Sequence, residues 1–143
     1  AETAPEKPAF RTAFAERRCL VPAEGFYEWE RKTTGNAGRD RHYYAPKEGL
    51  FAFAGLWQPG REGTPENFTI LTTEANALVA RVHDRMPVIL GHNALGAWLS
   101  PETPRDTLRE LMQPLPPSGM TDTNQGHASG SARENSDQMH LAI

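Results

Sequence analysis

Short runs of apolar and aromatic residues, separated by turn-forming residues, dominate the first two thirds of this chain of 143 residues. Such runs are typical of β-strands, because branched and aromatic side chains suit a half-buried pleated surface. The predicted strands cover residues 19–21, 26–31, 42–45, 51–56, 68–72 and 88–90. We expect 68–72 to be a central strand and 88–90 to be the last strand. The pattern therefore predicts a sheet of short strands.

Helical spacing interrupts this pattern in four places. An apolar stripe formed by Phe10, Ala13 and Phe14 predicts a short amphipathic helix that ends near Arg18. Further helices are predicted over residues 75–80, 92–99 and 104–112. In the last of these, Pro104 occupies the first helical position and Thr103 is the predicted N-cap. Frequent strands with a few helices favour an α+β domain.

Composition and charge limit the function classes. A formal net charge of −3 argues against a surface that binds nucleic acid by phosphate neutralisation alone, so DNA binding would need a local basic patch. Cys19 is the only cysteine, so no internal disulfide can form. The sequence shows no signal peptide or long apolar run. We therefore expect a one-domain protein of the cytoplasm, associated with the nucleoid when it binds DNA, without a membrane partner.

One candidate for a basic patch is a predicted hairpin loop over residues 33–39. Arg31, Lys32, Arg39 and Arg41 surround it, with Asp40 as the opposing charge. Charged hairpin tips are often simply solvated, so the pattern alone leaves both interpretations open.

Two acid/base-capable side chains lie among apolar, strand-like residues. Glu28 stands between Tyr27 and Trp29, and strand alternation places it on the face of Phe26. His83 precedes an apolar run, and we expect no direct pair with Asp84, since neighbours on an extended chain point in opposite directions. From spacing alone, Glu28 can be a solvated carboxylate and His83 a capped or core imidazole. A functional pair is the alternative, because buried charge is costly without a purpose.

Four segments together resemble a known family. They are RCLVPAEGFYEW at 18–29, FAGLW at 53–57, FTILTT at 68–73 and VHDRMPVIL at 82–90. They closely resemble the SRAP family, the SOS response-associated peptidases that cross-link to abasic sites in single-stranded DNA. The resemblance runs over residues 1–114. It implies an α+β fold with a mostly antiparallel, barrel-like sheet and flanking helices.

The resemblance also implies roles for individual residues. Glu28 would move protons while the amine and thiol of an N-terminal cysteine close a thiazolidine on the sugar aldehyde, and His83 would help to open the sugar ring. Thr72 and Arg85 match family positions that contact the DNA backbone or the abasic sugar. The structural alternatives are simple strand propensity for Thr72 and a surface ion pair for Arg85. The family's enzymes are peptidases that remove their initiator Met autocatalytically, and the pocket needs no metal or cofactor.

The chain also departs from the family pattern at both ends. The nucleophilic cysteine and an Asn-Ala-Arg triplet are missing, and Cys19 cannot substitute because it lacks a free α-amine. We therefore expect the chain as given to be a monomer that does not cross-link. Residues 115–143 are expected to be a divergent, largely disordered tail. Two alternatives stay open: a non-covalent single-stranded DNA-binding remnant, and an unrelated hydrolase that uses Glu28 with His83.

Overall fold

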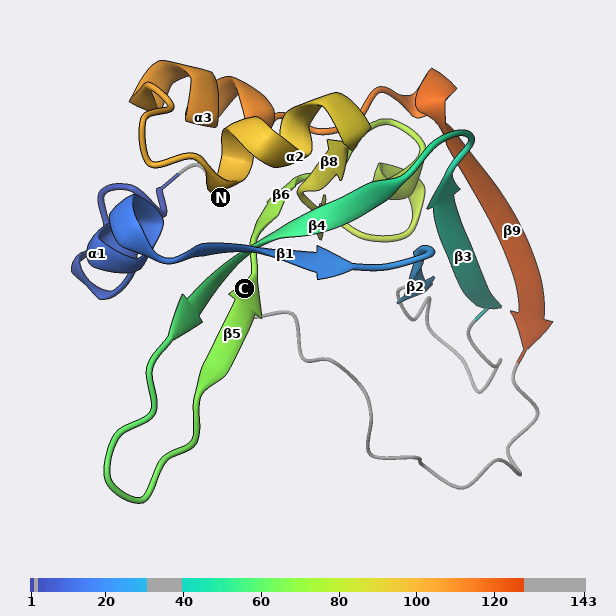
Figure 1. The fold of residues 1–143 in the computed structure, drawn as a ribbon. Helices are drawn as coiled ribbons and strands as arrows, with labels where there is room; N and C mark the ends of the chain where they lie inside the picture. Colours follow the sequence, from blue (N-terminus) through green and yellow to red (C-terminus); the bar gives the residue numbers. More distant parts are fainter. Residues whose placement is uncertain (2, 31–39, 128–143) are drawn as a thin grey trace.

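Strands outnumber helices in the computed structural model, which describes residues 1, 3–30 and 40–127 (Figure 1). The elements, in chain order, are α1 (Pro8–Glu16), β1 (Arg18–Pro22), β2 (Phe26–Trp29), β3 (Asp40–Pro46), β4 (Phe51–Gln58), β5 (Asn67–Ile70), β6 (Thr72–Glu74), the 3-10 turn η1 (Val79–Arg81), β7 (Arg85–Pro87), β8 (Ile89–Gly91), α2 (His92–Leu99), α3 (Arg105–Leu111), the 3-10 turn η2 (Pro117–Gly119) and β9 (Met120–His127). All strand pairs are antiparallel. The predicted α+β class is confirmed, although the described strands form separate sheets rather than a closed barrel.

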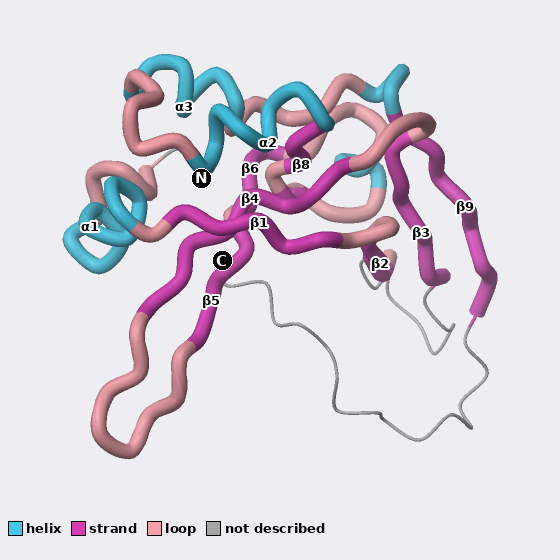
Figure 2. Tube along the Cα trace, in the orientation of Figure 1, coloured by secondary structure: helices cyan, strands magenta, loops and turns pink. Residues whose placement is uncertain are grey.

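Strand β4 is the centre of the largest sheet. It pairs with β1 along one edge, and with β8 and β5 along the other. Residues Phe51 to Leu56 of this strand are all buried, which explains their uninterrupted apolar pattern. Helices α2 and α3 lie on one side of this sheet, as Figure 2 shows in cyan. Trp98 of α2 packs edge-on against Phe14 of α1 at 6.0 Å between ring centroids.

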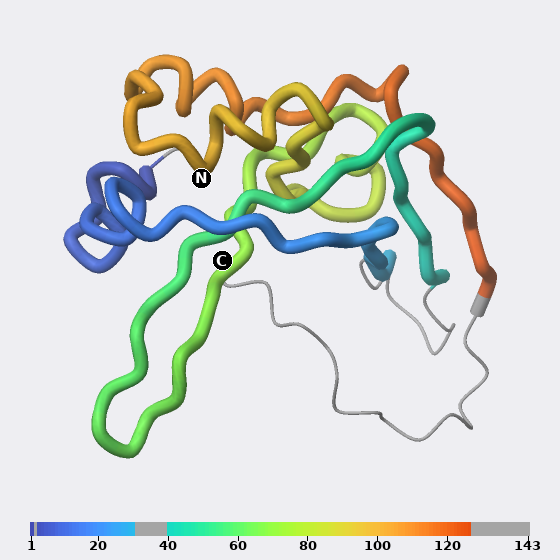
Figure 3. Tube along the Cα trace, viewed as in Figure 1, coloured from blue at the N-terminus to red at the C-terminus, as the bar shows by residue number. Residues whose placement is uncertain are grey.

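A second sheet has the order β2, β3, β9. Figure 3 shows β3 and β9 side by side, although β9 is the last element of the described chain. The inner face of this sheet packs on the other through Phe26 and Tyr44, whose rings stack at 5.3 Å, and through Phe53 of β4. This packing brings β2 and β3 next to the turn that carries His83.

The predicted central strand over residues 68–72 is wrong in two respects. It is divided into β5 and β6, and it lies at the edge of β4 rather than at the centre. The break occurs because Leu71 joins a triangle of backbone hydrogen bonds. Leu71 N–H donates to Ala54 O, Val88 N–H donates to Leu71 O, and Ala54 N–H donates to Val88 O, at 2.8–2.9 Å. This triangle lets β4 pair with two strands on one edge.

The helix predictions hold where an apolar stripe supports them. Helix α2 spans the predicted residues 92–99, and α3 buries Leu108. Helix α1 ends at Glu16, close to the predicted end near Arg18. The helix predicted over 75–80 is wrong, because the Asn76 carboxamide accepts the N–H groups of Leu78 and Val79 and leaves only the single turn η1. Thr103 is not the N-cap of α3, since its hydroxyl donates to the Ala97 carbonyl.

The expectation of a disordered tail from residue 115 is wrong for residues 117–127. These residues form η2 and β9, and β9 is the last core strand that the sequence pattern does not reveal. Met120 is buried, whereas much of the strand is polar and exposed. Residues 128–143 and the predicted loop over 33–39 lie outside the described residues.

Candidate active site

Glu28 is half-buried on the inner face of the β2–β3 sheet. It shares this face with buried Phe26, whereas Tyr27 is 50% exposed on the opposite face, so the predicted alternation is confirmed. Burial raises the pKa of the Glu28 carboxyl; the charge of His83 lowers it, that of Asp84 raises it, and the net change is upward. A carboxyl with a raised pKa holds its proton to higher pH and is better suited to act as an acid.

His83 lies in the turn between η1 and β7. Its Nδ1 is 3.1 Å from both the N–H and the carbonyl oxygen of Arg85, so it accepts from the first or donates to the second. The same nitrogen lies 3.5 Å from the Asp84 carboxylate. The prediction that His83 and Asp84 do not pair is therefore wrong, because residues 82–84 form a turn and a bend rather than an extended segment.

Thr72 and Arg85 come together across the β6–β7 ladder. Arg85 Nη2 donates to the Thr72 carbonyl at 2.6 Å and lies 3.4 Å from its hydroxyl. Both residues line a hollow of about 320 Å³, together with Lys7 and Phe10 of the N-terminal segment. The α-amino group of Ala1 also donates to the Thr72 carbonyl at this hollow. Arg85 and Lys7 are the basic side chains among its described lining residues, and a guanidinium can bond phosphate oxygens bidentately.

The four candidate residues form a connected row. The charge of His83 acts on Glu28, His83 bonds the backbone of Arg85, and the Arg85 side chain bonds Thr72. The row has a carboxyl and an imidazole at one end and a hydrogen-bonded cation at the other. Such a row can move protons at a bound molecule while the cation holds an adjacent anionic group.

Cys19 and Arg41 complete the residues singled out by sequence. Burial raises the pKa of the Cys19 thiol, which agrees with the interpretation of an inert cysteine. Arg41 of β3 stacks its guanidinium over Tyr27 at 4.8 Å and Trp29 at 5.7 Å. Arg31, Lys32 and Arg39 of the predicted basic patch are not among the described residues.

A buried cluster next to Glu28 is missed by sequence reasoning. His42 Nδ1 lies 2.7 Å from Asp122 Oδ1, and Asp122 Oδ2 lies 3.2 Å from Arg81. Tyr44 is fully buried, and no described residue accepts or donates a hydrogen bond at its hydroxyl. Alternation along β3 gives a signal for His42 and Tyr44, but nothing in the sequence indicates Asp122 as their partner.

Comparison with known proteins identifies the family. The family model for the SOS response associated peptidase (SRAP) matches residues 1–124. The chain belongs to the SRAP family. This match extends past the expected limit at residue 114 and includes the first half of β9.

Relatives of this SRAP chain include the abasic site processing proteins YoaM and YoqW of Bacillus subtilis. YoaM is 43% identical over 118 residues, which cover 80% of this chain and 52% of YoaM. YoqW is 38% identical over 143 residues, which cover 97% of this chain and 63% of YoqW. The abasic site processing protein HMCES of Xenopus tropicalis is 31% identical over 80% of this chain and 41% of HMCES. The chain thus spans about half to two thirds of its bacterial relatives.

Solved structures share the fold. A protein from Bacteroides thetaiotaomicron superposes with a TM-score of 0.76 at 29% identity, over 85% of this chain and 55% of that protein. A phage-related protein from Bordetella bronchiseptica gives 0.69 at 27% identity, over 86% of this chain and 60% of its own.

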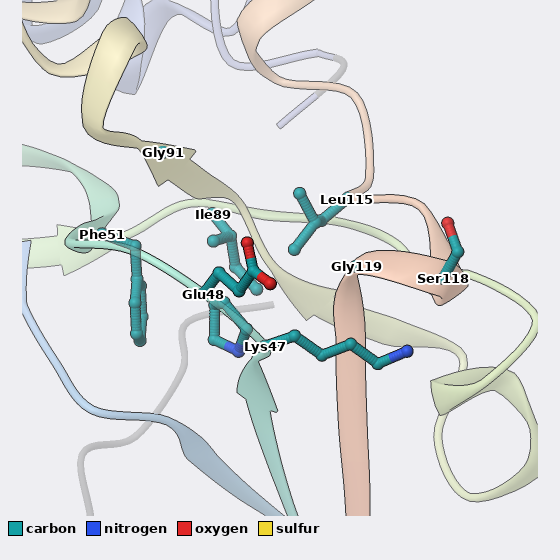
Figure 4. A pocket seen from close by; sticks show the side chains of 9 residues that line it. Lys47, Glu48, Phe51, Ile89, Gly91, Leu115, Ser118 and Gly119 are labelled. Carbon is teal, nitrogen blue, oxygen red and sulfur yellow. The ribbon is translucent and has the colours of Figure 1, made fainter.

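A second hollow of about 390 Å³ has a different lining from the first (Figure 4). Phe51, Ile89 and Leu115 form its apolar part, and Lys47 and Glu48 stand at its side. None of the four candidate residues lines it. Among the described residues, no group of three or more His, Cys, Asp or Glu side chains is arranged to hold a metal ion. The same residues contain no helix long and apolar enough to span a membrane.

Proposed function

We propose that this SRAP chain is part of a protein that processes abasic sites in single-stranded DNA. The observation that carries the proposal is that half-buried Glu28, whose pKa is raised by burial, lies close enough to His83 from a distant part of the chain for the His83 charge to act on its carboxyl. Relatives named for abasic site processing support the substrate class.

The chemistry requires two proton-moving groups. His83 takes the proton of the sugar C1 hydroxyl and returns one to the ring oxygen, which opens the ring and exposes the aldehyde. The α-amine of an N-terminal cysteine then adds to the aldehyde, and one of its protons passes to the carbonyl oxygen, which becomes a hydroxyl. Glu28 donates the proton with which this hydroxyl leaves as water, and its carboxylate then takes back the remaining N–H proton, which leaves the imine. The cysteine sulfur adds to the resulting imine carbon and closes the thiazolidine, while its proton passes to the nitrogen. Thr72 and Arg85 hold the adjoining phosphate and sugar.

Cross-linking tests this function directly. A segment that begins with cysteine is placed before Ala1, and the same segment beginning with serine serves as the matched control. We expect a band that survives denaturing electrophoresis with abasic single-stranded DNA, only for the cysteine version, and much more slowly for His83→Gln. A folded cysteine version that forms no such band, or whose rate is unchanged by His83→Gln, contradicts the proposal.

A second candidate function is non-covalent binding of single-stranded DNA. The observation that favours it is a ladder of aromatic rings and a cation on the outer face of β2 and β3. Tyr27 and Tyr43 lie 4.9 Å apart, and Arg41 stacks over Tyr27 and Trp29. Unpaired bases stack on such rings, with about 1–3 kcal/mol for each base.

The ladder is tested with an oligonucleotide that contains no abasic site. Tyr27→Ala should weaken binding by at least about fivefold, in keeping with the lower end of that stacking energy. Phe68→Ala is the matched control, because Phe68 is 52% exposed on β5 in the other sheet. Equal affinities for the two variants would remove the ladder from DNA binding.

A further inference from the structure

Three charged side chains from separate elements meet next to the proposed active site. His42 lies on β3, Asp122 on β9 and Arg81 at the end of η1. His42 is buried and only 14% of the Asp122 side chain is exposed, whereas 63% of the Arg81 side chain is exposed. Asp122 uses one carboxylate oxygen for His42 at 2.7 Å and the other for Arg81 at 3.2 Å. We call these residues the His42–Asp122–Arg81 network.

The network contacts the proposed site from two directions. His42 stands directly opposite Glu28 in the β2–β3 register, so the two side chains are neighbours on one sheet face. Arg81 is two residues before His83, and the His83 N–H donates to the Val79 carbonyl of η1 at 2.9 Å. Asp122 therefore bridges the strand beside Glu28 and the turn that presents His83.

The neighbouring carboxylates favour the protonated form of His42. Burial lowers the pKa of His42, but the hydrogen bond and charge of Asp122, followed by those of Glu30, raise it, and the net change is upward. His42 Nε2 lies 3.4 Å from Glu30, the distance of an ion pair rather than of a well-formed hydrogen bond. Burial and the charge of Asp122 are also the main reasons that the pKa of Tyr44 is raised to about 12. Asp122 is thus the central anion of this region.

We propose that the His42–Asp122–Arg81 network positions Glu28 and His83 against each other, so that its three members are positioning residues of the reaction. This inference rests on the proposed function, because it assigns Glu28 and His83 as the reacting pair. The physical reason is geometric. Glu28 and His83 have no direct bond to each other, so their separation depends on how β3 and η1 are held together. Asp122 contacts a side chain of each of these elements, His42 on β3 and Arg81 on η1.

The test measures the coupling between Glu28 and His83 in the chain itself, without DNA. The Glu28 carboxyl is titrated by carbon-13 NMR, with and without His83→Gln. Because the His83 charge lowers the pKa of Glu28, His83→Gln should raise it. In an Arg81→Met background we expect less than half of this response. Arg81 is exposed, so this variant should fold; Asp122→Asn is the second variant, isosteric at the network centre.

Two controls separate positioning from a general effect. Arg81→Lys keeps a cation and should retain the full response. Arg109→Met removes an arginine that is half exposed and pairs with Asp106 and Glu6 elsewhere, and it should change nothing. If His83→Gln changes the Glu28 pKa equally with and without Arg81, the positioning role of the network is overturned and the proposed function stays intact. If His83→Gln fails to move the Glu28 pKa in the unmodified chain, the pairing of the two residues is wrong and the network falls with it. Failure of cross-linking, with the response of the Glu28 pKa intact and dependent on Arg81, would overturn the proposed function and with it the role of the network in the reaction, while the geometric coupling of Glu28 and His83 would stand.

Discussion

Replacing Glu28 by glutamine should make the protein more stable and less active. The carboxyl is desolvated on the inner sheet face, and its pKa is raised above the unfolded value of about 4.3 because burial disfavours the charged form. The folded state therefore prefers the protonated form. Stability falls as the pH rises from about 4 through the folded pKa, and the cost is fully present above the folded pKa.

The size of the two effects can be compared. One pKa unit corresponds to about 1.4 kcal/mol. Since Glu28 is only half-buried, solvent screening keeps the gain on neutralisation small. Loss of a positioned proton-transfer group removes on the order of 10²–10⁴-fold in rate, which is about 3–5 kcal/mol of transition-state stabilisation. The kinetic loss should therefore far exceed the stability gain.

Urea unfolding of the variant and the unmodified chain at pH 3 and pH 7 measures the first effect. We expect Glu28→Gln to be the more stable at pH 7 and equal at pH 3, where both side chains are neutral. Cross-linking of the version with a cysteine-first segment measures the second effect. Glu24→Gln is the matched control, because Glu24 is exposed in the bend before β2. A Glu28→Gln variant that is destabilised at pH 7 and cross-links at the unmodified rate would make Glu28 an ordinary structural residue.

Three further predictions concern other parts of the molecule. Arg85→Ala should lower affinity for single-stranded DNA and reduce the slope of log K against log salt by about 0.7. Fluorescence anisotropy over a salt series measures the slope, and an unchanged slope would exclude Arg85 as a phosphate contact. Gly25→Ala should destabilise by more than about 2 kcal/mol, because a Cβ there would lie 2.5 Å from the Tyr43 ring and from the Tyr44 backbone oxygen. Gly96→Ala, at an exposed position of α2, should stabilise by about 0.5–1 kcal/mol in the same urea assay. Cys19 should react with a disulfide reagent at least about tenfold more slowly than free cysteine at pH 8, since burial raises its pKa; an equal rate would show an accessible thiolate.

The elements that sequence could predict are those in which burial follows a local pattern. The continuous apolar run from Phe51 to Leu56 becomes the buried centre of the largest sheet, and the stripe containing Trp98 becomes α2. Alternation along β2 also placed Glu28 on the face of Phe26. In each case the side chains of one segment carry the information, because the period of burial matches the geometry of a strand or a helix.

Other features depend on contacts between distant segments. The division of the predicted strand 68–72 follows from hydrogen bonds of Leu71 to Ala54 and Val88, and the short turn η1 follows from the side chain of Asn76. Backbone hydrogen bonding of this kind leaves no apolar signature. Glu28 and His83 could be chosen as candidates because their residue types are unusual among apolar neighbours. The family resemblance then favoured a functional role over a purely structural one.

Strand β9 shows why the remaining part of the site is hidden from sequence. Met120 anchors one end of the strand, and further along Asp122 is largely buried in a strand that is otherwise mostly polar. A buried ion pair contributes little net stability, because desolvation offsets most of its attraction. It does discriminate between registers: a slip of one residue relative to β3 would turn Asp122 to the face opposite His42 and leave the imidazole without its 2.7 Å partner. We infer that Asp122 specifies the register of β9 more than it stabilises the fold. Removal of Asp122 alone should therefore disturb the geometry of Glu28 and His83 and also lower Tm, because it leaves the buried His42 without its partner.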